Sequence, residues 1–128
     1  MAAAKQRVGV ASTISKHING AVFEVRQGYK SRDSKREKAY MATSVDAYQE
    51  FLLPVVLLLS TQIDEAVAER YHAGKWLLLV GTTAGSATDS TYAFCREVVC
   101  YDLAAFFERN ATAIKAEIEN VLKALLKP

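Results

Sequence analysis

The sequence predicts an α/β domain, and three features of the chain lead to that prediction. Two aliphatic runs, 55–60 and 75–81, have the length of strands that are buried on both faces. Segments with apolar residues at helical spacing alternate with these runs. The pair Asn19-Gly20, flanked by β-rich segments, is typical of a tight hairpin turn. The expected order is β-β-α-β-α-β-α-α, a mixed β-sheet from an N-terminal hairpin plus two βαβ crossovers, flanked by helices, with two C-terminal helices.

The hairpin is expected to pair residues 8–18 with residues 21–28. Both central positions of its type I′ turn need a positive φ, which Asn and Gly adopt most easily. Because side chains alternate along a strand, the hairpin would have one apolar face and one polar face.

A long helix is expected next, over about 35–52. Ser34 and Glu37 have the spacing of a capping box at its start. Apolar residues then recur at helical spacing until Pro54, which would end the helix. The aliphatic run 55–60 follows as a buried strand in the middle of the sheet.

The second crossover is expected to begin at Thr61, which can cap a helix over about 62–72. Gly74 lies just past the end of that helix, as glycine does at many helix C-termini. The second aliphatic strand, 75–81, then leads into a loop over 82–88.

Two helices are expected at the C-terminus. Asp89 or Ser90 would cap the first, which runs to about 108, and the second spans about 111–126. The first is apolar on more than one side because of Tyr92, Phe94, Tyr101, Phe106 and Phe107. The second has one apolar stripe, formed by Ile114, Ile118, Val121, Leu122 and Leu125. These surfaces predict a homodimer that associates through its C-terminal helices.

Charge is divided unevenly along the chain. Residues 1–38 contain nine Lys or Arg and three acids, a net charge of +6, whereas residues 39–128 contain seven against eleven, a net charge of −4. A basic face most often binds nucleic acid or another polyanion. The alternatives are a solvated basic surface, or a dimer in which the basic part of one subunit meets the acidic part of the other.

The basic residues concentrate in the stretch 28–40. Several lie in the first turn of the expected helix, where the helix dipole disfavours cations and favours a bound phosphate. Tyrosines beside them could stack on bases or sugars. The expected nucleic-acid-binding residues are Tyr29, Lys30, Arg32, Lys35, Arg36 and Lys38.

The polar face of the expected hairpin is a candidate catalytic patch. Glu24 and Arg26 alternate so that they point the same way, and His17 would be a diagonal neighbour on the opposite strand. A carboxylate, a cation and a histidine on one patch can bind a metal or activate a water. The alternative is a cross-strand salt-bridge patch exposed to solvent.

The segment "VFEVRQGYKSRDSKR" resembles the later half of restriction-endonuclease-like nucleases, the PD-(D/E)XK family. Glu24-Val25-Arg26 corresponds to the family's Glu-x-Lys, with Arg in place of Lys, and the resemblance covers roughly residues 10–60. It implies a DNA substrate, Glu24 as a metal ligand, and Mg²⁺ as the metal if the chain is a nuclease.

The chain departs from that family's pattern in two ways. The sequence has no Asp or Glu before Glu24, so the first metal-binding acid is missing. The guanidinium of Arg26 stays protonated and cannot act as the lysine would. The expected function is therefore DNA binding by a nuclease-like fold with an incomplete active site, or that of a truncated nuclease whose first acid lies outside this chain. The alternative is a non-enzymatic α/β homodimer or assembly subunit.

A third expectation concerns the loop between the second aliphatic strand and the next helix. Ligands bind at this position in many α/β sheets. Gly81, Gly85 and several hydroxyl groups could hold a phosphate or a nucleotide, although the loop lacks a Walker A motif.

The bulk composition predicts a single domain, 1–128, in a reducing compartment. Cys95 and Cys100 lack metal-ligand spacing and are expected to be buried free thiols. The run "FLLPVVLLL" is too short to span a bilayer, and the N-terminus lacks the apolar core of a signal peptide. A cytoplasmic protein without a membrane partner is expected.

Overall fold

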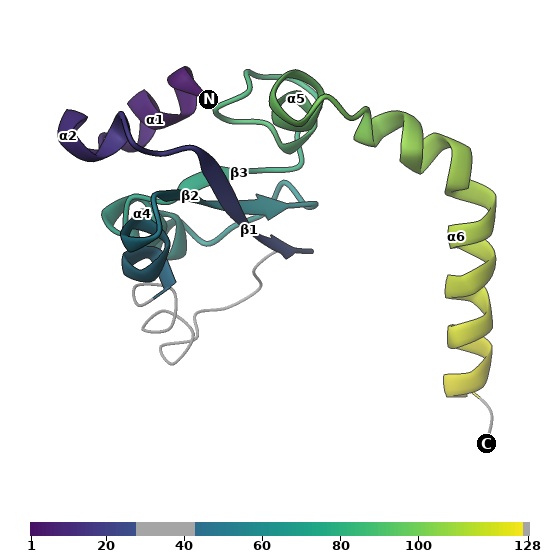
Figure 1. Cartoon of the computed structure of the whole chain (residues 1–128). Coiled ribbons are helices and arrows are strands. Elements are labelled where there is room, and N and C mark those ends of the chain that lie inside the picture. The colour runs from purple at the N-terminus through teal and green to yellow at the C-terminus, as the bar shows by residue number, and fades with distance from the viewer. Residues whose placement is uncertain (28–42, 127–128) are drawn as a thin grey trace.

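A computed structural model of the chain describes residues 1–27 and 43–126 (Figure 1). It confirms the α/β class. The elements in chain order are α1 (Ala2–Val8), α2 (Ser12–Ser15), β1 (Gly20–Arg26), a helix over 43–49, β2 (Leu52–Leu58), α4 (Glu65–Ala73), β3 (Leu77–Leu79), α5 (Thr91–Phe94), the π-helical segment η1 (Cys95–Val99) and α6 (Leu103–Leu126).

The described sheet has three parallel strands in the order β1-β2-β3. The pairing of β1 with β2 begins at Gly20↔Leu52, and that of β2 with β3 at Val55↔Leu77. The helix over 43–49 lies between β1 and β2 along the chain, and α4 lies between β2 and β3. The two predicted βαβ crossovers are therefore present.

The predicted N-terminal hairpin is wrong, and the described sheet is parallel instead of mixed. Residues 2–8 and 12–15 are helical, so the strand expected over 8–18 does not form. The backbone N–H of Asn19 donates to the carbonyl of Phe51 at 3.2 Å, which leads the chain into β1 beside β2. Long-range pairing with a buried strand thus overrides the local preference of Asn-Gly for a turn.

The predicted helix over 35–52 is confirmed in part: it ends at residue 49, and Leu52 already belongs to β2. Residues 43–49 are helical, and residues 35–42 lie outside the described residues. The helix ends before the predicted stop at Pro54, because Phe51 adopts a left-handed conformation with φ 56°.

Pro54 lies inside the central strand β2, where proline is unusual. The carbonyl of Phe51 and the N–H of Leu59 both bond toward β1. Because these directions alternate along a strand, the nitrogen of Pro54 faces the β3 side. That position is one residue before the pairing of β2 with β3 begins at Val55, so the missing N–H leaves no β3 acceptor unpaired.

The strand β2 is buried on both faces, as the sequence predicted. On one face its side chains pack with α1, β3 and α5, in the cluster Ala4, Val8, Ile18, Leu53, Val55, Leu77, Leu79 and Phe94. On the other face they pack with α4, in the cluster Val56, Leu58, Val67, Tyr71 and Trp76. Figure 1 shows α1 and α5 above the sheet and α4 below it.

The second crossover differs from prediction in its details. Asp64, and not Thr61, caps α4: its carboxylate accepts from the N–H groups of Ala66 and Val67. Gly74 stands at the C-cap as expected, but Lys75 adopts the left-handed conformation, with φ 61°.

The C-terminal region is divided differently from the prediction. Ser90 caps α5 as expected, its hydroxyl accepting from the N–H of Ala93 at 3.2 Å. The predicted helix to 108 is instead interrupted at Cys100, which has φ 63°. A new helix begins after Asp102, whose carboxylate accepts from the N–H of Ala105 at 3.0 Å. This helix, α6, continues through the predicted break at 108–111.

Candidate functional site

The predicted catalytic pair, Glu24 and Arg26, lies together on β1. The Nε of Arg26 donates to Oε1 of Glu24 at 2.8 Å, and both side chains are partly buried. The hydroxyl of the buried Tyr71, on α4, lies 3.4 Å from Oε2 of the same carboxylate. The pair therefore faces α4 and is held by it.

The chemistry open to this pair is limited. Within the described residues, no group of three His, Cys, Asp or Glu side chains is placed to hold a metal ion. Arg26 remains a cation at physiological pH and cannot serve as a general base. In the described structure, the arrangement is that of a tethered ion pair.

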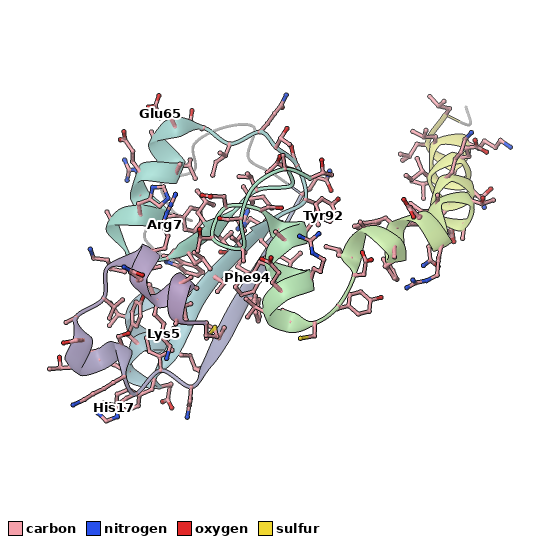
Figure 2. All side chains as sticks on the ribbon, turned by 90° about the horizontal axis from the view of Figure 1, so that it is seen from above. Lys5, Arg7, His17, Glu65, Tyr92 and Phe94 are labelled. Atoms are coloured by element: carbon pink, nitrogen blue, oxygen red, sulfur yellow. The ribbon has the colours of Figure 1, made fainter. Side chains whose placement is uncertain are left out.

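His17, the third predicted catalytic residue, is not brought to this pair. It precedes β1, and its ring packs edge-on against Phe51 with centroids 5.5 Å apart. Four residues of extended strand separate the start of β1 from Glu24, a span of roughly 13 Å. Figure 2 shows His17 at the periphery of the molecule. The predicted grouping is wrong because it depended on the hairpin.

The second set of predicted site residues is the nucleic-acid contacts of the stretch 28–40. Tyr29, Lys30, Arg32, Lys35, Arg36 and Lys38 lie outside the described residues.

The cations at 1–27 are mostly engaged within the protein. Lys5 donates to the carbonyl of Ile18 at 2.6 Å, and Arg7 forms an ion pair with Asp89 at 2.9 Å. Arg26 is paired with Glu24. Figure 2 shows Lys5 and Arg7 over the body of the protein. Three of the four cations in this segment thus have internal partners, and a phosphate would have to compete with them.

The loop over 82–90 satisfies many of its own polar groups. The hydroxyl of Ser86 contacts the hydroxyl of Thr88 and the carboxylate of Asp89 at 2.8 and 3.0 Å. The buried hydroxyl of Ser90 donates to the carbonyl of Thr82 at 2.6 Å. These contacts shape the connection between β3 and α5, using groups that the sequence suggested for phosphate binding.

An apolar groove of about 570 Å³ was not foreseen from the sequence. Its walls include Val10, Ile14, Val45, Tyr48 and Phe51. Val45 and Tyr48 have helical spacing, which is normally interpreted as the buried side of a helix. In the structure Val45 is 54% exposed, so these residues line a groove instead of packing in the core.

The most distinctive surface is the apolar stripe of α6. All 24 residues of this helix are described, and none of them is buried. Five large aliphatic residues are between 50% and 81% exposed: Ile118, Val121, Leu122, Leu125 and Leu126. Figures 1 and 2 both show α6 extending away from the α/β body. We call these five residues the α6 stripe.

The helix α6 also bends along its length, as both views show. The side-chain amide of Asn110 donates to the carbonyl of Phe106 at 2.8 Å, four residues earlier. Such bonds compete with the helical ladder and favour bending. The α6 stripe lies entirely after this point.

Comparison of the chain with protein-family models, curated proteins and solved structures found no match. Among the helices of the described residues, none has both the length and the apolar composition needed to cross a membrane.

Proposed function

We propose that this chain is a self-associating α/β subunit, and that α6 is the element through which copies join. The observation behind the proposal is the exposure of the α6 stripe. Its five aliphatic side chains leave at least half of their surface in water on a helix without any buried residue. Contiguous apolar surface of this kind is typical of interfaces.

A second copy of the chain is the partner that the charges allow most readily. The helix α6 contains three acidic and three basic residues, so it has no net charge. An identical helix therefore meets no overall repulsion. Closed homo-oligomers, and two-fold dimers above all, are the commonest soluble assemblies.

Sedimentation of the full-length protein tests this proposal. We expect dimers at tens of micromolar, and monomers for Leu122→Glu, because a carboxylate in an apolar interface loses its hydration without a partner. Asn120→Glu is the matched control, since it adds the same charge about 160° from Leu122 around the helix. A wild-type protein that stays monomeric at hundreds of micromolar would refute the proposal.

Nucleic-acid binding is a second candidate function, supported by the division of charge between residues 1–38 and 39–128. The resemblance of Glu24-Val25-Arg26 to a nuclease motif adds Mg²⁺-dependent cleavage to this candidate. Its strongest residues are the basic ones in the stretch 28–40, which lies outside the described residues.

A gel-shift titration tests this second candidate directly. Retardation of duplex DNA that falls steeply with salt would support it, because each phosphate contact releases counterions. An absence of binding at low salt would count against it. Incubation with Mg²⁺ or Mn²⁺ tests cleavage, and cleavage unaffected by Glu24→Ala would remove Glu24 from the mechanism.

A further inference from the structure

The strand β1 leaves apolar side chains exposed on one face of the sheet. Ala21 packs against the cluster shared by α1 and α5, and the ring of Phe23 lies 6.0 Å from that of Phe94 on α5. Because side chains alternate, Val25 shares this face, while Glu24 faces α4. Yet Phe23 is 42% exposed and Val25 is 61% exposed.

The exposure follows from the short cover on this face. The helix α5 has four residues and η1 has five, and α1 lies against β3, the strand at the opposite edge from β1. Figure 2 looks onto this face, with Phe94 labelled on α5. Parallel sheets are normally covered by helices on both faces. Among the helices that the structure describes, those on this face therefore leave the β1 end without part of its usual cover.

The α6 stripe has the breadth to supply that cover. Ile118, Val121 and Leu125 follow the narrow three-four spacing of a two-helix seam. Leu122 and Leu126 widen it on one side, which is typical of a helix that packs on a broad surface such as a sheet.

We propose that α6 of a second copy packs over Phe23 and Val25, and that the two copies exchange these helices reciprocally. This inference rests on the proposed self-association and specifies its geometry. Packing of α6 on the β1 of its own chain is disfavoured because α6 points away from its own body in both views, and only Cys100, Tyr101 and Asp102 connect it to η1.

The exposed surface is sufficient for such a dimer. A fully exposed aliphatic side chain presents roughly 100 Å². With the exposed fractions of the two surfaces, both reciprocal contacts together bury roughly 800 Å² of apolar side chain. Polar and backbone atoms around them bring the total to about the lower limit for a specific interface.

Disulfide trapping in the full-length protein tests the exchange. Both native cysteines are first removed, as Cys95→Ala and Cys100→Ser, which gives the background protein. Protein with Val25→Cys is then mixed with protein that has one cysteine on α6. The three α6 positions, all on the apolar side of the helix, are Ile118→Cys, Leu122→Cys and Leu125→Cys. After gentle oxidation we expect a mixed covalent dimer for at least one pair, because disulfides need Cα atoms within about 7 Å. Sedimentation of the same background before oxidation is the control for association.

The outcomes separate the inference from the proposed function. Disulfides between two α6 variants, with no product from the Val25→Cys mixtures, would show helix-to-helix pairing: the exchange would be wrong and self-association would stand. A background protein that remains monomeric would overturn self-association itself.

A pair of charge substitutions provides a second test. Val25→Glu should raise the dissociation constant of the dimer at least about tenfold, while Val45→Glu, in the apolar groove, should change that constant by less than about twofold. Equal weakening by both would contradict the exchange.

Discussion

Buried hydroxyl groups fix the way the C-terminal part of the chain joins the sheet. Thr91 is fully buried, and its hydroxyl donates to the carbonyl of Leu58 at 2.8 Å. Leu58 is the last residue of β2 and lies beyond the final β2–β3 pair, Leu57↔Leu79. A side chain thus provides the donor that a neighbouring strand would otherwise provide.

Replacing Thr91 with Val should destabilise the protein by about 1–3 kcal/mol, because the shape is kept while a buried carbonyl loses its donor. Urea unfolding followed by circular dichroism measures the change. Thr61→Val, at an exposed position, is the matched control and should alter stability by less than about 0.5 kcal/mol. Equal effects for both variants would contradict the structural role of the buried bond.

Tyr48 makes stability depend on pH in the alkaline range. Its hydroxyl donates to the carbonyl of Lys75, and burial raises the pKa of Tyr48 to about 12 from its ordinary value of 10.0. Since the folded state disfavours the tyrosinate, this contribution is fully present below pH 10 and is lost as the pH rises toward 12. Tyr48→Phe should therefore flatten the decline in unfolding midpoint between pH 9.5 and 11.5, relative to wild type. Parallel curves for the two proteins would show that Tyr48 does not contribute.

At the scale of single elements, capping groups decide where helices begin. The sequence offered Thr61 as the cap of the helix between β2 and β3, and the structure uses Asp64. Asp64 also places a negative charge at the positive end of the helix dipole, which Thr61 cannot do.

Asp64→Ala should cost about 1 kcal/mol of stability, since two N–H groups of α4 lose their acceptor. Thr61→Ala should leave the unfolding midpoint unchanged. Both are measured by chemical unfolding at pH 7. A larger loss for Thr61→Ala than for Asp64→Ala would restore the cap expected from the sequence.

The elements that the sequence predicted well are those whose signals are local and agree with one another. The aliphatic runs at 55–60 and 75–81 gave β2 and β3, and Ser90 gave the cap of α5. The hairpin failed because the partner of β1 is about thirty residues away in sequence, and no local pattern encodes that pairing. Asp102 was a usable signal for the start of α6, but the aromatic residues on both sides of it suggested one continuous helix.

The candidate site followed the same rule. Glu24 and Arg26 were expected to point the same way, and they do, because their grouping needs only the alternation of one strand. His17 was expected beside them only through the hairpin, and it lies elsewhere. Four of the five residues of the α6 stripe, all except Leu126, were predicted from spacing alone. The separation of α6 from the body is a tertiary property that spacing does not reveal.

For the whole molecule, the consequence of an exposed helix is that stability and association become linked. If copies join through α6, dimerisation stabilises the folded state, and the melting temperature should rise with protein concentration. We expect this rise for wild type between 2 and 200 µM, measured by differential scanning calorimetry. The melting temperature of Ile118→Glu should stay the same throughout that range. A wild-type melting temperature that does not depend on concentration would contradict the linkage.

The two cysteines allow selective chemical labelling of the segment just before α6. Cys95 is buried, and burial raises its pKa above the usual thiol value, whereas Cys100 is exposed, contrary to the expectation that both are buried. Since the thiolate is the reactive form, a maleimide dye at neutral pH should modify Cys100 well before Cys95. The native sequence therefore provides one selective attachment point at the junction between body and helix, and no engineered residue is needed. Fluorescence anisotropy of a dye at Cys100 can then measure how freely α6 moves.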